Sequence, residues 1–342
     1  MSLNPTIQKD LDTIKNSLSG IMISEKTFLV AGGAGFLGSW LCDTLNILNA
    51  RIICVDNLSS GSEKSVSHIK NNNFQLIKDD ICKYKPEEKI DYIINMACIA
   101  SPPLYQKYPI ETLDASVLGT RNMLEIARKN DVKGFLLTST SEIYGDAAII
   151  PTPEDYWGNV NPIGPRSIYD EGKRVAETYS ISYRQKYGLP IRIARIFNTY
   201  GPRLDVKSTS QYGRVIIKFI SQALNNQPLT VYGDGTQTRS FCYITDQIEG
   251  LFKLLLQSGI DGEVINLGND DEKTILDLAK LIIQLTKSKS EITLQPLPKD
   301  DPKRRRPDIT KARKLLEWQP KISLKEGLTK TITHIKQMTK QA

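Results

Sequence analysis

The chain has 342 residues, 40% of them hydrophobic and 24% charged, and a formal net charge of +7. This length suits one large α/β domain with a smaller lobe, and the composition is ordinary for a globular protein. The positive net charge fits an anionic ligand. A nucleic-acid partner is not expected, because the charges are dispersed along the sequence and no nucleic-acid-binding motif is present.

The cysteines and histidines indicate which kinds of site the protein is not expected to have. The five cysteines are scattered and form no Cys-x-x-Cys pair, so we expect free thiols in a reducing compartment. His68 and His334 are the only histidines, and both lie outside any motif. A histidine-based metal site and a Ser-His-Asp triad are therefore not expected, and no metal is predicted.

Residues 1–24 are polar with apolar residues at helical spacing, namely Leu3, Ile7, Leu11, Ile14 and Leu18. Because no long apolar stretch is present, we expect neither a signal peptide nor a membrane anchor, and the cytoplasm is the default location. The pattern predicts an added amphipathic helix that packs on its own domain, with a partner contact as the alternative.

A glycine-rich loop follows the first predicted strand, residues 27–31. Glycines 32, 35 and 38 separate this strand from a predicted helix over 39–48. Their missing side chains allow a tight turn and let the backbone approach a pyrophosphate, which the helix N-terminus then faces. The next strand, 51–55, ends at Asp56, whose carboxylate can bind a ribose diol and repels a 2′-phosphate. This order of elements predicts an NAD site.

Further strands are predicted at 74–78, 92–96, 134–138 and 191–196, and long helices at 110–129 and 169–187. Strands that alternate with helices predict an α/β fold, a doubly wound parallel Rossmann sheet. We expect the NAD-binding domain to span residues 25–200, with 240–260 returning to it. After Asn198, prolines and glycines interrupt the pattern, so residues 201–342 are expected mainly to form a smaller C-terminal substrate lobe.

Tyr169 and Lys173 are four residues apart and share one face of the predicted helix. An ammonium group one turn away lowers the pKa of a tyrosine phenol. The pair can then take a proton from a sugar hydroxyl while a hydride leaves the same carbon. Upstream, Thr138–Glu142 closes a strand, where ligands gather in such sheets. Its hydroxyls can bind a sugar and Glu142 can exchange a proton, with a solvated turn as the alternative.

Seven motifs together resemble the extended short-chain dehydrogenase/reductase family of nucleotide-sugar enzymes, over about residues 26–335. The motifs are GGAGFLGS from Gly32, ASPP from Ala100, STSEIYGD from Ser139, EDYWGNVNPIGPRSIYDEGKRVAET from Glu154, ARIFNTYGPR from Ala194, LTVYGDGTQTRSF from Leu229 and DDPKRRRPDITKA from Asp300. Within that family they are most similar to the UDP-glucuronate decarboxylases. The resemblance implies NAD as cofactor, a UDP-sugar (UDP-glucuronate) as substrate, and a homodimer formed through the helices 110–129 and 169–187.

The resemblance also implies roles for individual residues. The implied catalytic residues are the base Tyr169, its partner Lys173, Thr140 and Glu142 on the sugar, and Arg305 at the substrate carboxylate. The implied cofactor-binding residues are Gly32, Gly35, Phe36, Leu37, Gly38, Asp56, Asn57, Asp80, Ile81, Ala97, Tyr169 and Lys173. The implied substrate-binding residues are Ser141, Arg166, Asn198, Arg203, Arg214, Val215, Val231, Tyr232, Arg239 and Arg305.

The implied reaction is oxidation at C4, loss of CO₂ from the 4-keto uronate, reprotonation at C5 by Glu142 or Arg305 through water, and re-reduction at C4.

A 4,6-dehydratase is disfavoured because Ser141-Glu142 stands where such enzymes carry Asp-Glu. A 4-epimerase is disfavoured because these enzymes usually lack the glutamate. A decarboxylase that stops at the 4-keto pentose and a non-catalytic nucleotide-binding protein are further alternatives. Asn95, Ser116 and the loop 205–212 depart from the family pattern, which has His and Asn at the first two positions.

Overall fold

The computed structural model describes residues 3–204, 215–298 and 301–341. Its centre is a seven-stranded parallel sheet with the strand order β11-β6-β5-β4-β1-β2-β3. The strands are β1 (Thr27–Ala31), β2 (Arg51–Val55), β3 (Phe74–Ile77), β4 (Tyr92–Asn95), β5 (Gly134–Thr140), β6 (Ile191–Ile196) and β11 (Val264–Leu267). The strand order reverses between β1 and β4, and ligands bind at such a switch point in open α/β sheets.

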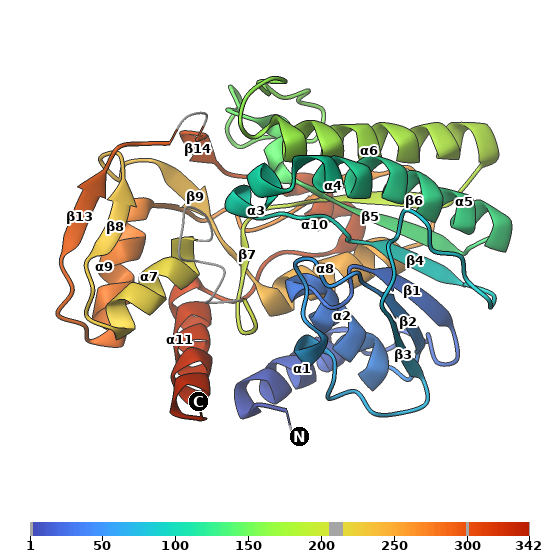
Figure 1. The fold of residues 1–342 in the computed structure, drawn as a ribbon, viewed down its shortest axis with the longest axis horizontal. Coiled ribbons are helices and arrows are strands. Elements are labelled where there is room, and N and C mark those ends of the chain that lie inside the picture. The colour runs from blue at the N-terminus through green and yellow to red at the C-terminus, as the bar shows by residue number, and fades with distance from the viewer. Residues whose placement is uncertain (1–2, 205–214, 299–300, 342) are drawn as a thin grey trace.

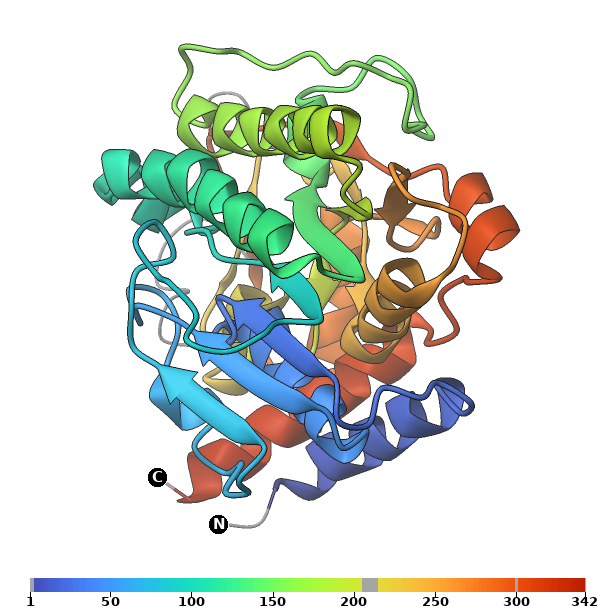
Figure 2. The same ribbon diagram turned by 90° about the vertical axis from the view of Figure 1, so that its right-hand side faces the viewer.

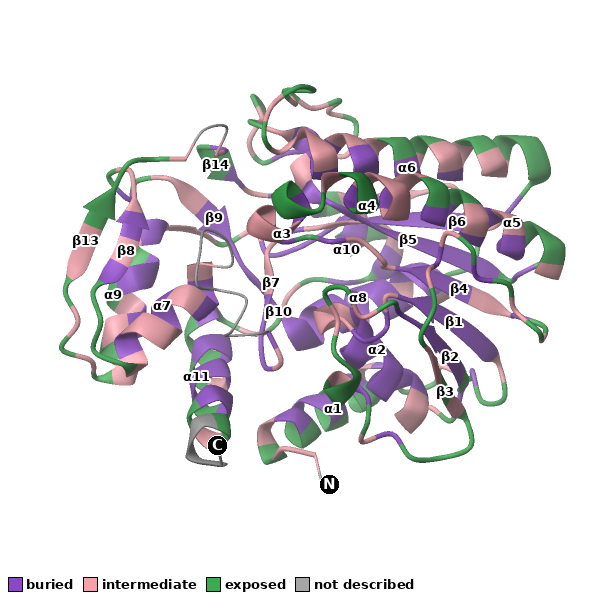
Figure 3. Ribbon diagram, in the orientation of Figure 1, coloured by how far each residue is buried: buried purple, intermediate pink, exposed green. Residues whose placement is uncertain are grey.

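Helices cover both faces of this sheet (Figure 2). One face carries α2 (Phe36–Ile47) and α8 (Ile244–Leu256), and the other carries α5 (Thr120–Asn130) and α6 (Ser167–Tyr187). Successive strand residues point to opposite faces, so Val30 and Leu29 belong to two different apolar clusters. Strands β1 and β5 are buried along their whole length (Figure 3). The predicted doubly wound parallel sheet is thereby confirmed.

The predicted strands all form, and two features depart from the prediction. The segment predicted as one helix over 110–129 contains α4 (Pro109–Asp114), the π-helical turn η2 (Ala115–Gly119) and α5. Strand β11 was not predicted, because its four residues form a very short apolar run between Gly262 and Gly268. It pairs with β6 and extends the sheet by one strand at that edge.

The smaller lobe lies at the left of Figure 1. It contains the parallel pair β8 (Leu229–Tyr232) and β13 (Ile292–Gln295), and the three-stranded unit β12 (Glu272–Thr274), β9 (Thr238–Ser240) and β14 (Arg304–Arg305). Helices α7 (Val215–Leu224) and α9 (Ile275–Thr286) pack together beside β8. The remaining elements are α3 (Pro102–Lys107), β7 (Thr199–Tyr200), β10 (Cys242–Tyr243), α10 (Thr310–Leu316), α11 (Leu324–Gln341) and the 3₁₀ turns η1 (Glu63–Ser65) and η3 (Ser141–Tyr144).

The N-terminal segment forms α1 (Pro5–Ser17), which packs against α8, α2 and α11. Its buried face carries Ile7, Leu11 and Ile14. Asp10 lies on the same face, where it accepts a hydrogen bond of 2.6 Å from the Tyr243 hydroxyl and pairs with Lys330 at 3.1 Å. Among the helices of the described ranges, none combines the length and apolarity needed to cross a membrane.

Candidate active site

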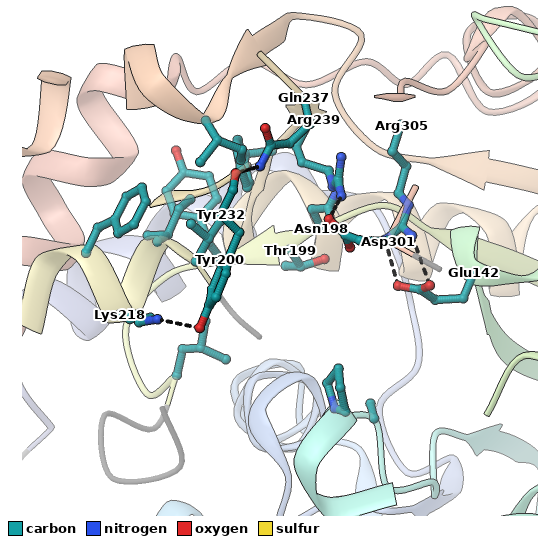
Figure 4. A pocket seen from close by; sticks show the side chains of 18 of the residues that line it. Glu142, Asn198, Thr199, Tyr200, Lys218, Tyr232, Gln237, Arg239, Asp301 and Arg305 are labelled. Carbon is teal, nitrogen blue, oxygen red and sulfur yellow. Dashed lines mark hydrogen bonds and ion pairs between the residues drawn. The ribbon is translucent and has the colours of Figure 1, made fainter. Parts of the chain in front are cut away.

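A pocket of about 240 Å³ lies between the two lobes, beside the carboxyl ends of β5 and β6. Both lobes line it. In Figure 4, Glu142, Asp301 and Arg305 gather at one end, and Lys218 and Tyr232 meet at the other. The first end also holds the Tyr169 phenol, so the two ends differ in chemistry: one gathers carboxylates and guanidinium groups, and the other combines an aromatic ring with a cation.

The Tyr169–Lys173 pair of α6 faces the end of β5. Tyr169 and Lys173 are both buried, one turn apart. The Lys173 ammonium donates a hydrogen bond of 2.9 Å to the carbonyl of Thr138. The Tyr169 phenol lies close enough to the Thr140 side chain to be influenced by it, and its ring stacks on Tyr105 at 5.7 Å between centroids. Tyr169, Lys173 and Thr140 are therefore brought together as predicted.

Burial, and not the lysine, dominates the proton affinity of this pair. It raises the pKa of the Tyr169 phenol, with the nearby Cys98 adding to the rise and the Thr140 hydroxyl opposing it. Burial likewise lowers the pKa of Lys173. The predicted lowering of the tyrosine pKa by Lys173 is therefore not seen in the protein alone, because both charged forms lose solvation.

Glu142 is held by arginines from two directions. Arg305 of β14 donates hydrogen bonds of 2.6 and 2.9 Å to its two carboxylate oxygens, and Arg166 donates one of 2.5 Å. Burial alone would raise the pKa of Glu142, but the two guanidinium groups outweigh it and hold that pKa at about 2. This geometry replaces the alternative of a solvated turn with a partly buried anion near Tyr169, paired with two arginines.

The glycine loop has the shape of a dinucleotide cradle. Gly32 has a φ of +79°, and a Cβ atom on Gly38 would lie 2.2 Å from the Gly32 carbonyl oxygen. The first turn of α2 has no side-chain cap, so its N–H groups are available to a phosphate. Asp56 accepts hydrogen bonds from the backbone N–H groups of Ala34 and Leu58, at 2.9 and 2.8 Å. These features fit NAD.

The other predicted cofactor residues lie along the same edge of the sheet. Phe36 and Leu37 open α2, and the backbone of Ala97 lies against Gly32. Asn57 and Asp80 follow β2 and β3, where their side chains accept hydrogen bonds from the backbone N–H groups of Ser59 and Cys82. The buried Ile81 comes next. The sequence did not single out Gly33, whose Cβ would lie 2.5 Å from the Cys54 sulfur.

The predicted substrate residues divide into two groups. Those that line the pocket are Arg166, Asn198, Val215, Tyr232, Arg239 and Arg305. Those that do not line it are Ser141, Arg203 and Val231. Arg214 and the loop 205–212 lie outside the described residues.

Strand geometry and a competing ion pair account for the residues outside the pocket. Val231 is buried in the core because Thr230 and Tyr232, its neighbours on β8, take the pocket-facing side. Arg203 pairs with Asp43 of α2 at 2.5 Å and lies over the Trp40 ring. Its guanidinium therefore braces α2 and does not face the pocket.

Several pocket residues were missed by sequence reasoning. Lys218 lies 3.2 Å from the Tyr232 hydroxyl and over its ring, and Asp301 pairs with Arg239 at 3.0 Å. Tyr105, Phe219 and Gln237 are among the other lining residues that were not predicted. Tyr105 follows the ASPP motif and Asp301 belongs to the DDPKRRRPD motif, so these motifs held a signal for both.

The two departures from the family pattern are buried behind the catalytic pair. The Asn95 amide donates a hydrogen bond of 3.0 Å to Thr120. Ser116 lies in the π-helical turn, 3.1 Å from the Cys98 sulfur, and a Cβ atom on Gly172 of α6 would lie 3.1 Å from its own Cβ. Neither lines the pocket, so both act on the packing of helices against the sheet.

The chain is similar in sequence and fold to known proteins. Residues 28–268 match the model of the NAD dependent epimerase/dehydratase family. The chain is 48% identical to UDP-glucuronic acid decarboxylase 1 of Danio rerio over 90% of its length and 72% of that protein. It is 48% identical to UDP-glucuronic acid decarboxylase 5 of Arabidopsis thaliana, over 89% and 88% of the two chains. A solved UDP-glucuronic acid 4-epimerase from Bacillus cereus, in complex with UDP-glucuronic acid and NAD, superposes with a TM-score of 0.81 at 29% identity, covering 91% of this chain and 99% of that one.

Proposed function

The chain belongs to the NAD dependent epimerase/dehydratase family, and we propose that it decarboxylates UDP-glucuronate to UDP-xylose. The observation that carries this proposal is the Arg305–Glu142 pair beside Tyr169. A guanidinium fork that already binds a carboxylate at the acid–base end of the pocket suits a substrate whose sugar carries a carboxylate.

NAD is the cofactor of this family, and when bound it supplies the acceptor and later the donor of the C4 hydride. The residues that would hold it are the loop from Gly32 to Gly38, Asp56 and the Tyr169–Lys173 pair. The uncapped first turn of α2 would meet the pyrophosphate, and Asp56 would meet a ribose.

We assign Tyr169 as the base for the C4 hydroxyl. This role requires that the pKa of the phenol, raised by burial in the protein alone, falls when the positively charged nicotinamide is bound beside it. The phenol lies near Thr140 at the end of β5, and Tyr169 lines the same pocket as the charged residues Glu142 and Arg305. Removal of the C4 hydrogen leaves a 4-keto uronic acid, whose carboxylate is β to the ketone. Tyr169 then holds the proton that it has taken, and it returns this proton to the C4 oxygen when the ketone is reduced.

Loss of CO₂ transfers the electrons of the broken C–C bond to the C4 oxygen as an enolate. Protonated Tyr169 and the Thr140 hydroxyl can both donate hydrogen bonds to that oxyanion. Arg305 is placed to bind the substrate carboxylate, which would compete with Glu142 for the same guanidinium group. Binding of a uronate therefore releases one side of Glu142 at the start of the reaction.

The opposite end of the pocket suits the nucleotide. Tyr232, Phe219 and Lys218 offer aromatic surfaces and a cation, and Arg239 lies between this end and the sugar end (Figure 4). We propose that the uracil ring lies at the Tyr232 end and that Arg239 and Asn198 contact the diphosphate. This arrangement directs the uronate ring toward Tyr169.

The test is product analysis with purified protein, UDP-glucuronate and added NAD⁺. NMR and mass spectrometry should show loss of one CO₂ and formation of UDP-xylose. An unchanged mass with inverted C4 would replace this proposal with epimerisation. A 4-keto pentose that accumulates would remove the final reduction from it.

We also propose that the chain forms a homodimer through residues 110–129, which form α4, η2 and α5, and through α6; Figure 1 shows α4, α5 and α6 side by side. Exposed apolar side chains on these elements support this, namely Ile110, Leu118, Val175 and Tyr187. Light scattering should give twice the chain mass, and the double substitution Ile110→Lys and Val175→Lys should give a monomer. Met22→Lys, at an exposed site elsewhere, is the control. A monomeric wild type would reject the dimer.

A cytoplasmic location is proposed on the basis of the cysteines. All five are free thiols, and three of them are buried. A reducing compartment keeps such thiols intact. Cell fractionation with an antibody to the chain should recover it with cytosolic markers, and recovery with secreted proteins would contradict the proposal.

A further inference from the structure

The proposed reaction consumes one proton per turnover, and this inference rests on that function. A carboxylate that leaves as CO₂ is replaced at C5 by hydrogen, so one proton must reach C5 from solvent. The proton on Tyr169 cannot serve, because it returns to the C4 oxygen. The active site therefore needs a route by which a proton arrives at a buried carbon in each cycle.

A second cavity, of about 250 Å³, lies on the other side of Glu142. Glu142, Arg166 and Asp301 line both cavities and so form the wall between them. The outer part of the second cavity is bordered by the exposed side chains of Asp146 and Asn161. Polar groups thus lead from the surface to the back of the residue that faces the sugar.

Asp170 lies at the inner part of this second cavity. Its side chain is only 4% exposed, and within the described ranges its buried Oδ1 atom has no hydrogen-bond partner. It is the residue after Tyr169, in the first turn of α6. A carboxyl oxygen that is buried without a partner and lines a polar cavity is placed to bind a water molecule or a proton there.

The charges around Asp170 favour its protonated form. Burial raises its pKa to about 8, the negative charges of Glu142 and Glu171 add to the rise, and Arg166 and Arg305 oppose it. Tyr105 also lies near it, on α3. Glu142, by contrast, is held ionised by its two arginines. Of these two neighbouring acids, Asp170 is the one that carries a proton at neutral pH.

We propose that Asp170 stores the proton that C5 receives and passes it on through water in the second cavity and through Glu142. The Asp170 O–H bond breaks, a proton moves across the cavity water to Glu142, and the proton of Glu142 forms the new C5–H bond. The enolate electrons form that bond, so no oxidant or reductant takes part. Asp170 then regains a proton from solvent through the Asp146 and Asn161 side.

A proton-storing role for Asp170 predicts that the oxidation and reduction half-reactions keep their rates. A structural role predicts that loss of Asp170 slows both. Oxidation at C4 precedes the need for the stored proton, and reduction of a 4-keto pentose follows it. Asp170→Asn keeps the size of the side chain but removes the acid. Only the reprotonation between the two half-reactions should slow, by about 10- to 100-fold, since a positioned acid contributes about that much or more.

The experiment follows single turnovers of the full-length enzyme with UDP-glucuronate by absorbance at 340 nm, in H₂O and D₂O. For Asp170→Asn we expect a normal rise, a slowed decay and a larger solvent isotope effect on the decay. The rate with a supplied UDP-4-keto-pentose and reduced cofactor should equal that of the wild type. Asp170→Glu should restore most of the decay rate. Asp155→Asn is the control, because it makes the same chemical change at an exposed acid that lines neither cavity.

Each other outcome has a defined meaning. A wild-type decay rate in Asp170→Asn, or equal slowing of both half-reactions, would overturn the proton route while leaving the decarboxylase intact. A wild type that releases no CO₂ would overturn the proposed function and this route with it. If Asp170→Asn does not fold, Val160→Phe, which narrows the cavity from its side wall, must give the same slowed decay.

Discussion

Arg305 binds both carboxylate oxygens of Glu142, at 2.6 and 2.9 Å, although the two residues lie 163 positions apart and in different lobes. Glu142 follows the central strand β5, and Arg305 belongs to β14, which pairs with β9 of the smaller lobe. The contact therefore joins the two lobes at the charged end of the pocket, so the position of Arg305 at this end depends on how the smaller lobe packs on the sheet.

Replacement of Arg305 by lysine tests the fork. Lysine keeps the positive charge but donates from one nitrogen, so it cannot hold two carboxylate oxygens in one plane. We expect Arg305→Lys to lower kcat/KM for UDP-glucuronate by about 10- to 100-fold, because a hydrogen bond to a charged group contributes about 1.5–3 kcal/mol. Steady-state kinetics of UDP-xylose formation measure the loss.

The neighbouring Arg304 provides the control. It is exposed and pairs with Glu272 outside the pocket. Arg304→Lys should leave kcat/KM within about twofold of the wild type, since surface ion pairs contribute little. Equal losses in the two variants would show that β14 needs arginine for its fold and would remove the catalytic role of the fork.

Tyr169→Phe removes one oxygen from the site and keeps the ring that stacks on Tyr105. Without the phenol, nothing in the described pocket takes the C4 proton in its place, so turnover should fall by about 100- to 10,000-fold. NAD binding, followed by titration of protein fluorescence, should change little. Tyr183→Phe on the same helix is the control, because its hydroxyl bonds to Glu125 on the outer side. Full activity in Tyr169→Phe would end the assignment of the base.

Sequence order predicted the sheet and the cofactor loop because these features are local. A strand, a glycine loop, a helix and a second strand follow each other within residues 27–55, so periodicity and glycine spacing suffice to place them. The Tyr169–Lys173 face is likewise a property of one helix. Such local features can be predicted from residues that are close together in the sequence.

Features that depend on which side a residue faces could not be predicted in this way. Arg203 looked like a phosphate ligand until the structure showed Asp43 competing for it. Val231 and Tyr232 are adjacent, yet β8 sends one to the core and the other to the pocket. The resemblance implied roles for Glu142 and Arg305 at the substrate, but the contact between them was not predicted, since no spacing rule links two residues so far apart.

Gly38→Ala should disable the cofactor cradle. The added Cβ would lie 2.2 Å from the Gly32 carbonyl oxygen and 2.6 Å from the Gly33 Cα, and both are backbone atoms that cannot rotate away. Overpacking of this kind costs about 1–3 kcal/mol, so we expect the Kd for NAD⁺ to rise by about 10- to 100-fold in a calorimetric titration.

Gly188 provides the control, because its backbone has a positive φ but an added Cβ would meet no other atom. Gly188 caps α6 with a φ of +70° and has no atom within 4 Å of an added Cβ. Gly188→Ala should cost about 1 kcal/mol of stability, for the left-handed backbone alone, and leave NAD⁺ binding unchanged. An unchanged Kd in Gly38→Ala would mean that the loop shifts freely, which contradicts the close packing seen here.

The last prediction concerns the pH dependence of stability and uses Asp246, a buried acid at the start of α8 that is only 3% exposed. Its carboxylate accepts hydrogen bonds from the backbone N–H groups of Lys321 and Ile322, at 3.0 and 2.9 Å. Burial raises its pKa from 3.8 to about 6, with the two N–H groups opposing the rise. The folded state therefore binds this proton more tightly than the unfolded state does.

The sign of the effect follows from linkage. The contribution of Asp246 to the free energy of unfolding is full below about pH 4 and is lost as pH rises through about 6, for a total of about 3 kcal/mol by pH 7.5. The asparagine in Asp246→Asn does not ionise, so the variant does not lose this contribution as pH rises. The free energy of unfolding of Asp246→Asn minus that of the wild type should therefore increase by up to about 3 kcal/mol between pH 4.5 and 7.5. Urea unfolding at several pH values measures the difference, and the exposed Asp12→Asn should track the wild type. Parallel curves for Asp246→Asn and the wild type would show that the two backbone N–H groups compensate fully for burial, leaving Asp246 ionised across this range.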